Sequence, residues 1–161
     1  MELTFTAMTA DAAREALSWR YDGPYAVYNT TPDALEEAVA VFCDPANAYF
    51  AARAEDGALA GWCCFGPDAR VPGGDYADPD ALDVGIGLRP DLTGQGRGLA
   101  FFRAVLAFGR DRFAPARFRL TVAAFNARAR RVYAGAGFRA RGQFRRGNDP
   151  AAPEFILMIA G

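Results

Sequence analysis

Residues 83–99 read DVGIGLRPDLTGQGRGL and combine, in order, an apolar strand, a turn and the start of a helix. Pro90 ends the strand, and three alternate glycines lead into an apolar helical stripe that begins at Leu99. Glycine has no Cβ, so a ligand can approach the backbone closely at these positions. The first amides of a helix have no partner within the helix and carry partial positive charge. The stretch therefore predicts an anion site that best suits a pyrophosphate.

Two other interpretations of this stretch stay open. A dinucleotide-binding loop needs a third glycine at a fixed spacing and an acidic residue at the end of the next strand. Leu99 and Phe101 stand where that glycine is needed, and the next predicted strand ends in Val122-Ala123-Ala124, so this class is disfavoured. A flexible strand-to-helix turn without a ligand is the second alternative.

Strand and helix signals follow one another on both sides of the loop, with no internal repeat and no long linker. Asp56-Gly57 marks a hairpin, and Thr9, Thr31 and Asn126 are typical helix caps. The expected strands are 3–6, 49–55, 58–65, 82–88, 117–122, 138–144 and 155–159, and the expected helices are 10–19, 32–43, 99–113 and 127–136. This order predicts one α/β (α+β) domain over residues 1–161, with helices on a mixed sheet.

The composition removes several kinds of chemistry. The 161 residues include no histidine and no lysine, and all 18 basic residues are arginine. A Ser-His-Asp triad, a Schiff-base lysine and a Walker A loop are therefore excluded. Cys43, Cys63 and Cys64 lack the spacing of metal ligands, so we expect no metal site, and core thiols suit a reducing compartment. No apolar run reaches the roughly 20 residues of a membrane span, and no signal peptide is evident, so we expect a cytoplasmic protein.

Charge is divided unevenly along the chain. Residues 1–88 hold four arginines and 15 acidic residues, whereas residues 89–161 hold 14 arginines and four acidic residues. This division indicates a basic half that faces an anion and an acidic half that faces a neutral or cationic partner, although the halves could also simply attract each other. Aromatic residues are not interleaved with the arginines on one face, so we expect no nucleic-acid partner.

A second pattern, NARARRVYAGAGF, spans residues 126–138. This pattern and the glycine loop together resemble the two signatures of the GNAT superfamily of acyl-CoA-dependent N-acyltransferases, and the resemblance extends from Leu3 to Ile159. Gly96 and Gly98 match the glycines of that family's acyl-CoA loop, whereas Thr93 stands where Gln or Arg is usual. The resemblance implies a GNAT-like, mixed, twisted central sheet of six to seven strands flanked by about four helices, with a splay between the strands at 82–88 and 117–122.

The resemblance also assigns roles around that splay. Pantetheine would lie in the gap, with Ile86, Gly87 and Leu88 against the pantetheine and the thioester. The pyrophosphate would lie on the loop, against Gly94, Gln95, Gly96, Arg97, Gly98 and Leu99. Asn126 would contact the cofactor's arm, or act only as a helix cap.

Two further residues are implied as catalytic. Tyr133 would be the general acid that protonates the departing CoA thiolate, and its alternative is a core aromatic residue. Asp83 shares a strand face with Gly85 and Gly87, and many family members carry an acidic residue there. Asp83 or an ordered water would then accept the proton of the amine, while a contact between Asp83 and an arginine or a loop amide is the alternative.

The acidic half of the chain would carry the acceptor. Trp19, Tyr21, Tyr25 and Tyr28 could form an aromatic wall for a cationic amine, or could instead pack the first helices onto the sheet. Loop carboxylates could join them, namely Asp22, Asp75, Asp78 and Asp80.

The resemblance thus implies an N-acetyltransferase that moves an acetyl group from acetyl-CoA to a primary amine by direct attack in a ternary complex. The acceptor would be a small-molecule or peptide amine, with no nucleic-acid or membrane partner, and a homodimer is open. The alternative is a non-catalytic acyl-CoA-binding sensor or partner module of the same fold.

Overall fold

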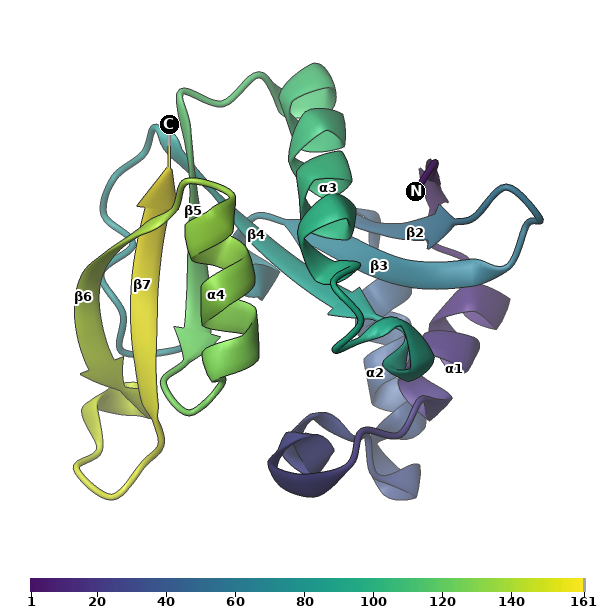
Figure 1. The fold of residues 1–161 in the computed structure, drawn as a ribbon. Coiled ribbons are helices and arrows are strands. Elements are labelled where there is room, and N and C mark those ends of the chain that lie inside the picture. Colours follow the sequence, from purple (N-terminus) through teal and green to yellow (C-terminus); the bar gives the residue numbers. More distant parts are fainter. Residues whose placement is uncertain (161) are drawn as a thin grey trace.

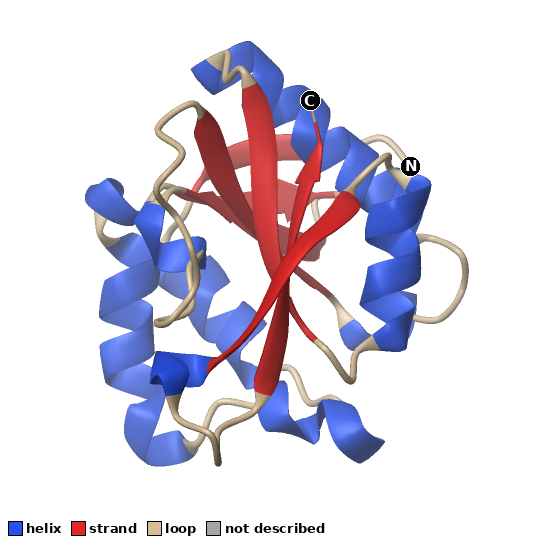
Figure 2. Ribbon diagram, turned by 90° about the vertical axis from the view of Figure 1, so that its left-hand side faces the viewer, coloured by secondary structure: helices blue, strands red, loops and turns tan. Residues whose placement is uncertain are grey.

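The computed structural model describes residues 1–160, which form a seven-stranded sheet with α-helices on both faces (Figures 1 and 2). The strands are β1 (Thr4–Ala7), β2 (Tyr49–Arg53), β3 (Leu59–Phe65), β4 (Ala81–Leu88), β5 (Arg117–Ala123), β6 (Arg139–Arg145) and β7 (Glu154–Ala160). The helices are α1 (Ala10–Ser18), α2 (Leu35–Cys43), α3 (Gly98–Phe113) and α4 (Ala127–Gly135). The predicted order and number of strands and α-helices are confirmed. Within the described residues, no helix combines the length and the apolar character needed to cross a membrane.

The sheet is mixed and opens at its centre. Its strand order is β1-β2-β3-β4-β5-β7-β6, and β4 and β5 are the parallel neighbours. β3 pairs with β4 as far as Leu88, whereas the pairing of β4 with β5 ends at Asp83, opposite Arg119. Beyond that pair the two strands diverge, as Figure 1 shows. The splay predicted between these strands is confirmed.

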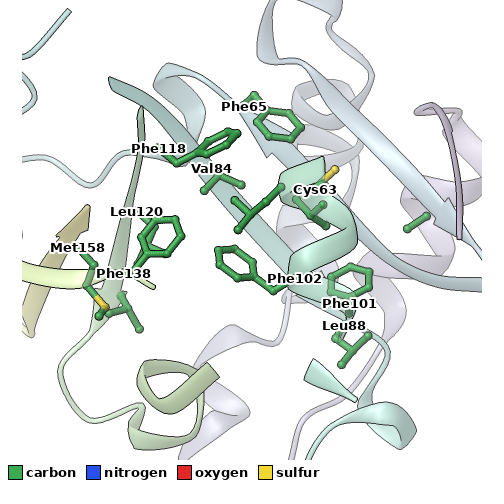
Figure 3. Close-up of a cluster of buried hydrophobic side chains, with 14 of the residues drawn as sticks. Cys63, Phe65, Val84, Leu88, Phe101, Phe102, Phe118, Leu120, Phe138 and Met158 are labelled. Carbon is green, nitrogen blue, oxygen red and sulfur yellow. The ribbon is translucent and has the colours of Figure 1, made fainter. Parts of the chain in front are cut away.

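The main core lies between the sheet and helices α3 and α4. α3 buries Phe101, Phe102, Val105 and Leu106, and this i, i+1, i+4, i+5 spacing gives the helix one apolar stripe. Figure 3 shows Phe101 and Phe102 of this stripe among buried side chains of the central strands. Gly109 lets the helix approach the sheet, because a Cβ atom there would lie 2.6 Å from the ring of Phe65.

The opposite face of the sheet carries α1 and α2. Thr9 caps α1 by accepting a hydrogen bond from the amide of Ala12, as predicted. The buried residues of α1 are all alanines, so this helix lies close to β2 and β3. Cys63 and Cys64 are buried free thiols that join the cores on the two different faces.

Two N-terminal segments differ locally from the expectation. The carbonyl of Thr31 accepts a bond from the amide of Ala34, so Pro32–Ala34 forms a 3₁₀ turn and α2 begins only at Leu35. Gly23–Tyr28, expected as an irregular loop, forms a 3₁₀ helix. Proline fixes the φ angle that the first turn of either helix type requires, so the sequence signal for the two is the same.

Candidate functional site

A cavity of about 1030 Å³ opens where β4 and β5 diverge. This volume is sufficient for the arm of a large cofactor together with a second small molecule. Most of the site residues predicted from the sequence line it: Trp19, Tyr21, Tyr25, Tyr28, Ile86, Gly87, Leu88, Gly94, Gly96, Gly98, Leu99, Asn126 and Tyr133. Gln95, Arg97 and Asp83 are not part of the lining.

The backbone of β4 is the first polar element of the cavity. The amide of Arg89 donates to a carbonyl of β3 at 2.9 Å. The carbonyl of Asp83 accepts a hydrogen bond from the amide of the residue that follows β3, at 2.8 Å. Backbone groups alternate between the two edges of a strand, so those of Ile86 and Leu88 point to the edge that β5 has left. In agreement, the hydroxyl of Tyr21 donates to the carbonyl of Leu88 across 2.8 Å. The edge of β4 is therefore able to bond an extended chain in the gap.

The glycine loop is the second polar element. Gly94 and Gly96 have φ angles of +71° and +74°, which L-residues with side chains rarely adopt. No side chain caps α3 at Arg97, so the first amides of the helix are available to a ligand. The guanidinium of Arg128, at the start of α4, lies against the loop, because a Cβ on Gly94 would be 3.5 Å from its Nη1. Backbone amides, a helix N-terminus and one arginine thus lie together, an arrangement that can bind an anion.

Side chains within the loop hold its own turn. The hydroxyl of Thr93 donates to the carbonyl of Pro90 at 2.7 Å, and the side-chain Nε2 of Gln95 donates to the carbonyl of Asp91 at 2.7 Å. The side chain of Gln95 is therefore engaged within the loop, and its backbone amide is the group that the predicted pyrophosphate contact would use.

Tyr133 lies on α4 and faces the cavity. Its ring packs edge-on against Phe102 at 4.8 Å between centroids. Burial, and to a lesser extent the neighbouring Tyr28, raise the pKa of the Tyr133 phenol well above its ordinary value near 10. The hydroxyl is therefore protonated at neutral and mildly alkaline pH and can only act as a donor toward an anion. Both interpretations of Tyr133 are compatible with this position.

Asp83 lies beneath the splay rather than in the cavity. Its carboxylate is buried and accepts two bonds from Arg119, at 2.7 and 2.8 Å, and one from Nε of Arg70, at 2.8 Å. Proton uptake would weaken all three charge-assisted bonds. The arrangement does not suit a general base, and it matches the alternative contact with an arginine.

The predicted aromatic wall crosses the mouth of the gap. The rings of Tyr25 and Tyr28 pack on Phe125, and Arg128 stacks over Tyr25 at 4.2 Å. Asn126 caps α4 through a bond from the amide of residue 129, as predicted, and also donates to the hydroxyl of Tyr28 at 3.2 Å. Burial raises the pKa of Tyr21, which bonds β4, to about 12. The aromatic wall therefore links the end of β4 to the start of α4.

A second aromatic group was not predicted. Phe42 stacks on Tyr49 with centroids 4.1 Å apart, and Trp62 lies 5.1 Å from Phe42 and 5.5 Å from Tyr49. All three line the cavity. The indole of Trp62 covers Gly87, since a Cβ on that glycine would lie 2.1 Å from the indole nitrogen. Their sequence signals were those of ordinary core positions, so only the fold shows that they face the site.

The charges around the cavity also differ from the expectation. Among the described residues that line the cavity, Asp68 is the one with a carboxylate, and the guanidinium groups come from Arg70, Arg128 and Arg131. None of the four predicted loop carboxylates lines this cavity, and one of them, Asp78, is instead paired with Arg117 at 2.8 Å. Across residues 1–160, no cluster of three or more acidic or cysteine side chains could hold a metal.

Comparison with known families gives one match over most of the chain. The model described as "Acetyltransferase (GNAT) family" matches residues 11–138. That range includes the glycine loop, the splayed strands and Tyr133. No curated protein sequence matches the chain.

Solved structures share the fold at low sequence identity. A GNAT-family acetyltransferase from Bacillus anthracis is 17% identical, with a TM-score of 0.72 over 99% of this chain and 95% of that one. The spermidine N-acetyltransferase of Vibrio cholerae, in complex with CoA and spermine, is 19% identical, with a TM-score of 0.65 over 98% and 94%. The aminoglycoside acetyltransferase AAC(6')-Ib, in complex with coenzyme A, is 19% identical, with a TM-score of 0.70 over 99% and 94%.

Proposed function

Because the chain belongs to the acetyltransferase (GNAT) family, we propose that it transfers the acetyl group of acetyl-CoA to a primary amine by direct attack in a ternary complex. The observation that carries the proposal is the cavity at the splay, which is lined both by the glycine loop and by Tyr133. Structures of the same fold hold CoA, and one holds spermine as well, which supports an amine as acceptor.

The cavity has the polar groups that CoA requires. The pyrophosphate would lie on the amides at the start of α3 and beside Arg128. Pantetheine contains two amides, and the edge of β4 that β5 has left would bond them at Ile86 and at the amide of Leu88 as a neighbouring strand would. Asn126 would bond the same arm from the other side of the gap.

The acyl transfer needs one polarised carbonyl and one free amine. A backbone amide of the Ile86–Leu88 segment would donate to the thioester oxygen and stabilise its developing charge. The amine nitrogen forms a bond to the carbonyl carbon, and the carbon–sulfur bond then breaks. The products are an N-acetyl amine and CoA.

Two protons must move. The proton lost by the amine would pass to water, with Asp68 as the carboxylate of the cavity that can receive it. Asp83 is not used, because both of its oxygens are bonded to arginines. The phenol of Tyr133 would donate its proton to the sulfur as the thiolate leaves.

The test is release of CoA thiol from acetyl-CoA in the presence of a panel of primary amines. We expect release that depends on both the protein and the amine, with an equal amount of N-acetyl product. CoA binding without amine-dependent release would identify the alternative, a sensor or partner module with the same fold. Absence of CoA binding would overturn both the proposed acetyltransferase and the alternative sensor or partner module.

A further inference from the structure

The cavity divides into two parts with different chemistry. One part contains the glycine loop and the arginines of α4. The other, here called the acceptor half, contains Phe42, Tyr49, Trp62, Asp68 and Arg70. The proposed function places the acetyl group between them, so the acceptor half should match the amine.

The apolar side of the acceptor half is an ordered aromatic surface. Phe42 and Tyr49 are buried and stacked, and Trp62 packs against both. Trp62 also covers Gly87 on β4, so this surface reaches the strand that would carry the thioester. Such a surface suits an apolar or aromatic body next to the reacting amine.

The charges of the acceptor half do not suit a polycation. Asp68 is the carboxylate in the described lining, and it already accepts a hydrogen bond from the hydroxyl of Tyr49. The three arginines of the lining would repel a molecule that carries several ammonium groups. Arg128 lies against the glycine loop, and Arg131 follows it one turn later on the same helix, whereas Arg70 comes from a different part of the chain and belongs to the acceptor half.

Arg70 belongs to a cluster with one positive charge in excess. Asp83 is shared by Arg119, which is buried, and by Arg70, whose side chain is 37% exposed and lines the cavity. Arg119 alone bonds both oxygens of the carboxylate. The excess charge therefore belongs to Arg70, which is one of the residues that line the cavity.

The guanidinium of Arg70 is also held in place. Its Nε donates to Asp83 at 2.8 Å, and its plane lies over the ring of Tyr76 at 5.2 Å. Tyr76 is fixed in turn by hydrogen bonds with Thr121, at 2.7 Å, and with the amide of Val71, at 2.9 Å. In the described structure both Nη groups of Arg70 lack a side-chain partner, and a guanidinium presents such groups as a fork to a carboxylate.

We propose that the acceptor is an amine that also carries a carboxylate and an apolar or aromatic body. The carboxylate binds Arg70, and the body packs on Phe42, Tyr49 and Trp62. This inference rests on the proposed function. It narrows the acceptor to amino acids and similar small zwitterions, and it excludes polyamines and aminoglycosides.

The test compares matched pairs of amines that differ only in the carboxylate: L-phenylalanine with phenethylamine, L-tryptophan with tryptamine, and glycyl-L-phenylalanine with its decarboxylated analogue. Spermidine and one aminoglycoside complete the panel. For at least one pair, we expect kcat/KM to be about 10-fold or more higher for the carboxylated member, mainly through KM. In Arg70→Met the ratio within that pair should fall to about one.

Arg117 provides the matched control. It has the same 37% exposure and the same 2.8 Å bond from Nε, to Asp78, but it does not line the cavity. Arg117→Met should keep the wild-type ratio. If Arg70→Met does not fold, Arg70→Lys serves instead, because lysine retains the charge without the fork and should lower the ratio partially.

The outcomes separate this inference from the proposed function. A ratio near one in every pair, an unchanged ratio in the Arg70 variant, or a preference for spermidine or the aminoglycoside would overturn the carboxylate proposal while acetyl transfer stands. No amine-dependent thiol release with any member of the panel would overturn the proposed function itself.

Discussion

At the scale of single residues, two side chains of the same region have opposite chemistry. Tyr133 is a neutral donor that faces the cavity, and Asp83 is a charged acceptor whose oxygens are already bonded. The first is free to take part in a reaction, whereas the second holds the base of the splay together. Replacing each one should therefore change a different property of the protein.

Removal of the Tyr133 hydroxyl should slow acetyl transfer without lowering the affinity for CoA. Tyr133→Phe keeps the ring and its packing on Phe102. A lost general acid typically lowers kcat by about 100-fold or more. Steady-state kinetics and CoA titration calorimetry measure the two effects separately. Unchanged turnover would reduce Tyr133 to a core aromatic residue.

Removal of the Asp83 charge should affect stability most. Asp83→Asn leaves the buried guanidinium of Arg119 without its counter-ion, and breaking such a pair costs about 3–5 kcal/mol of the free energy of unfolding. Asp78→Asn is the matched control at the partly exposed pair with Arg117, and should cost about 1 kcal/mol or less. Denaturant titration compares the variants.

One result would restore Asp83 to the mechanism. If Asp83→Asn unfolds at the wild-type denaturant concentration and yet does not turn over, the carboxylate acts on the amine. Arg119 would then have to be neutralised in some other way.

At the scale of elements, the glycine loop and the end of β4 border the same cavity, where we propose that CoA binds. The loop places backbone amides of α3 next to a gap that exists because β5 stops pairing with β4 at Asp83. Neither element suffices alone: the helix supplies partial positive charge, and the free strand edge supplies directed hydrogen bonds.

A carboxylate introduced into the loop should block CoA binding. Gly96 has a positive φ and no neighbour within 4 Å, so Gly96→Glu adds a charge next to the phosphates with no steric clash. Two like charges at about 4 Å repel by about 4 kcal/mol near a protein surface, so CoA affinity should fall by about 100-fold or more.

Gly147 is the matched control for this variant. Its φ is +62° against +74° for Gly96, and its surroundings are equally open, but it does not line the cavity. Gly147→Glu should bear the same backbone strain and bind CoA as the wild type does. Equal loss of CoA affinity in both variants would argue against the loop as the phosphate site.

At the scale of the whole molecule, much of the architecture followed from local signals. Alternating strands, capped helices and the glycine loop each act within a few residues, so the order of the elements was predictable. The splay was implied only by the resemblance to the GNAT superfamily. The register of Asp83 with Arg119, 36 residues apart, depends on tertiary packing and carries no local signal. For the same reason, Phe42, Tyr49 and Trp62 looked like core residues until the fold placed them around the cavity.

Stability of the whole molecule should decrease in alkali. Burial raises the pKa of the thiol of Cys63 and of the phenol of Tyr49, and raises that of Cys64 to about 12. In the unfolded chain the thiols lose protons near pH 8.5 and the phenol near pH 10, so above those values the unfolded state binds fewer protons. Each such group then lowers the free energy of unfolding by about 1.4 kcal/mol per pH unit.

Thermal denaturation across pH measures this effect. The midpoint should be nearly constant from pH 6 to 8, since the chain has no histidine, and should fall progressively from about pH 9 upward. A midpoint that is constant to pH 11 would show that these groups are hydrated in the folded protein.

Acetyl transfer from CoA to an amine in the cavity at the splay is the proposal on which the assigned residue roles depend. Mass spectrometry of the products formed from acetyl-CoA with an isotopically labelled acetyl group tests it most directly. We expect one labelled N-acetyl amine for each CoA thiol released, and no thiol release when the amine is left out. Thiol release without a labelled amine, or CoA binding with no labelled product for any amine, would contradict it.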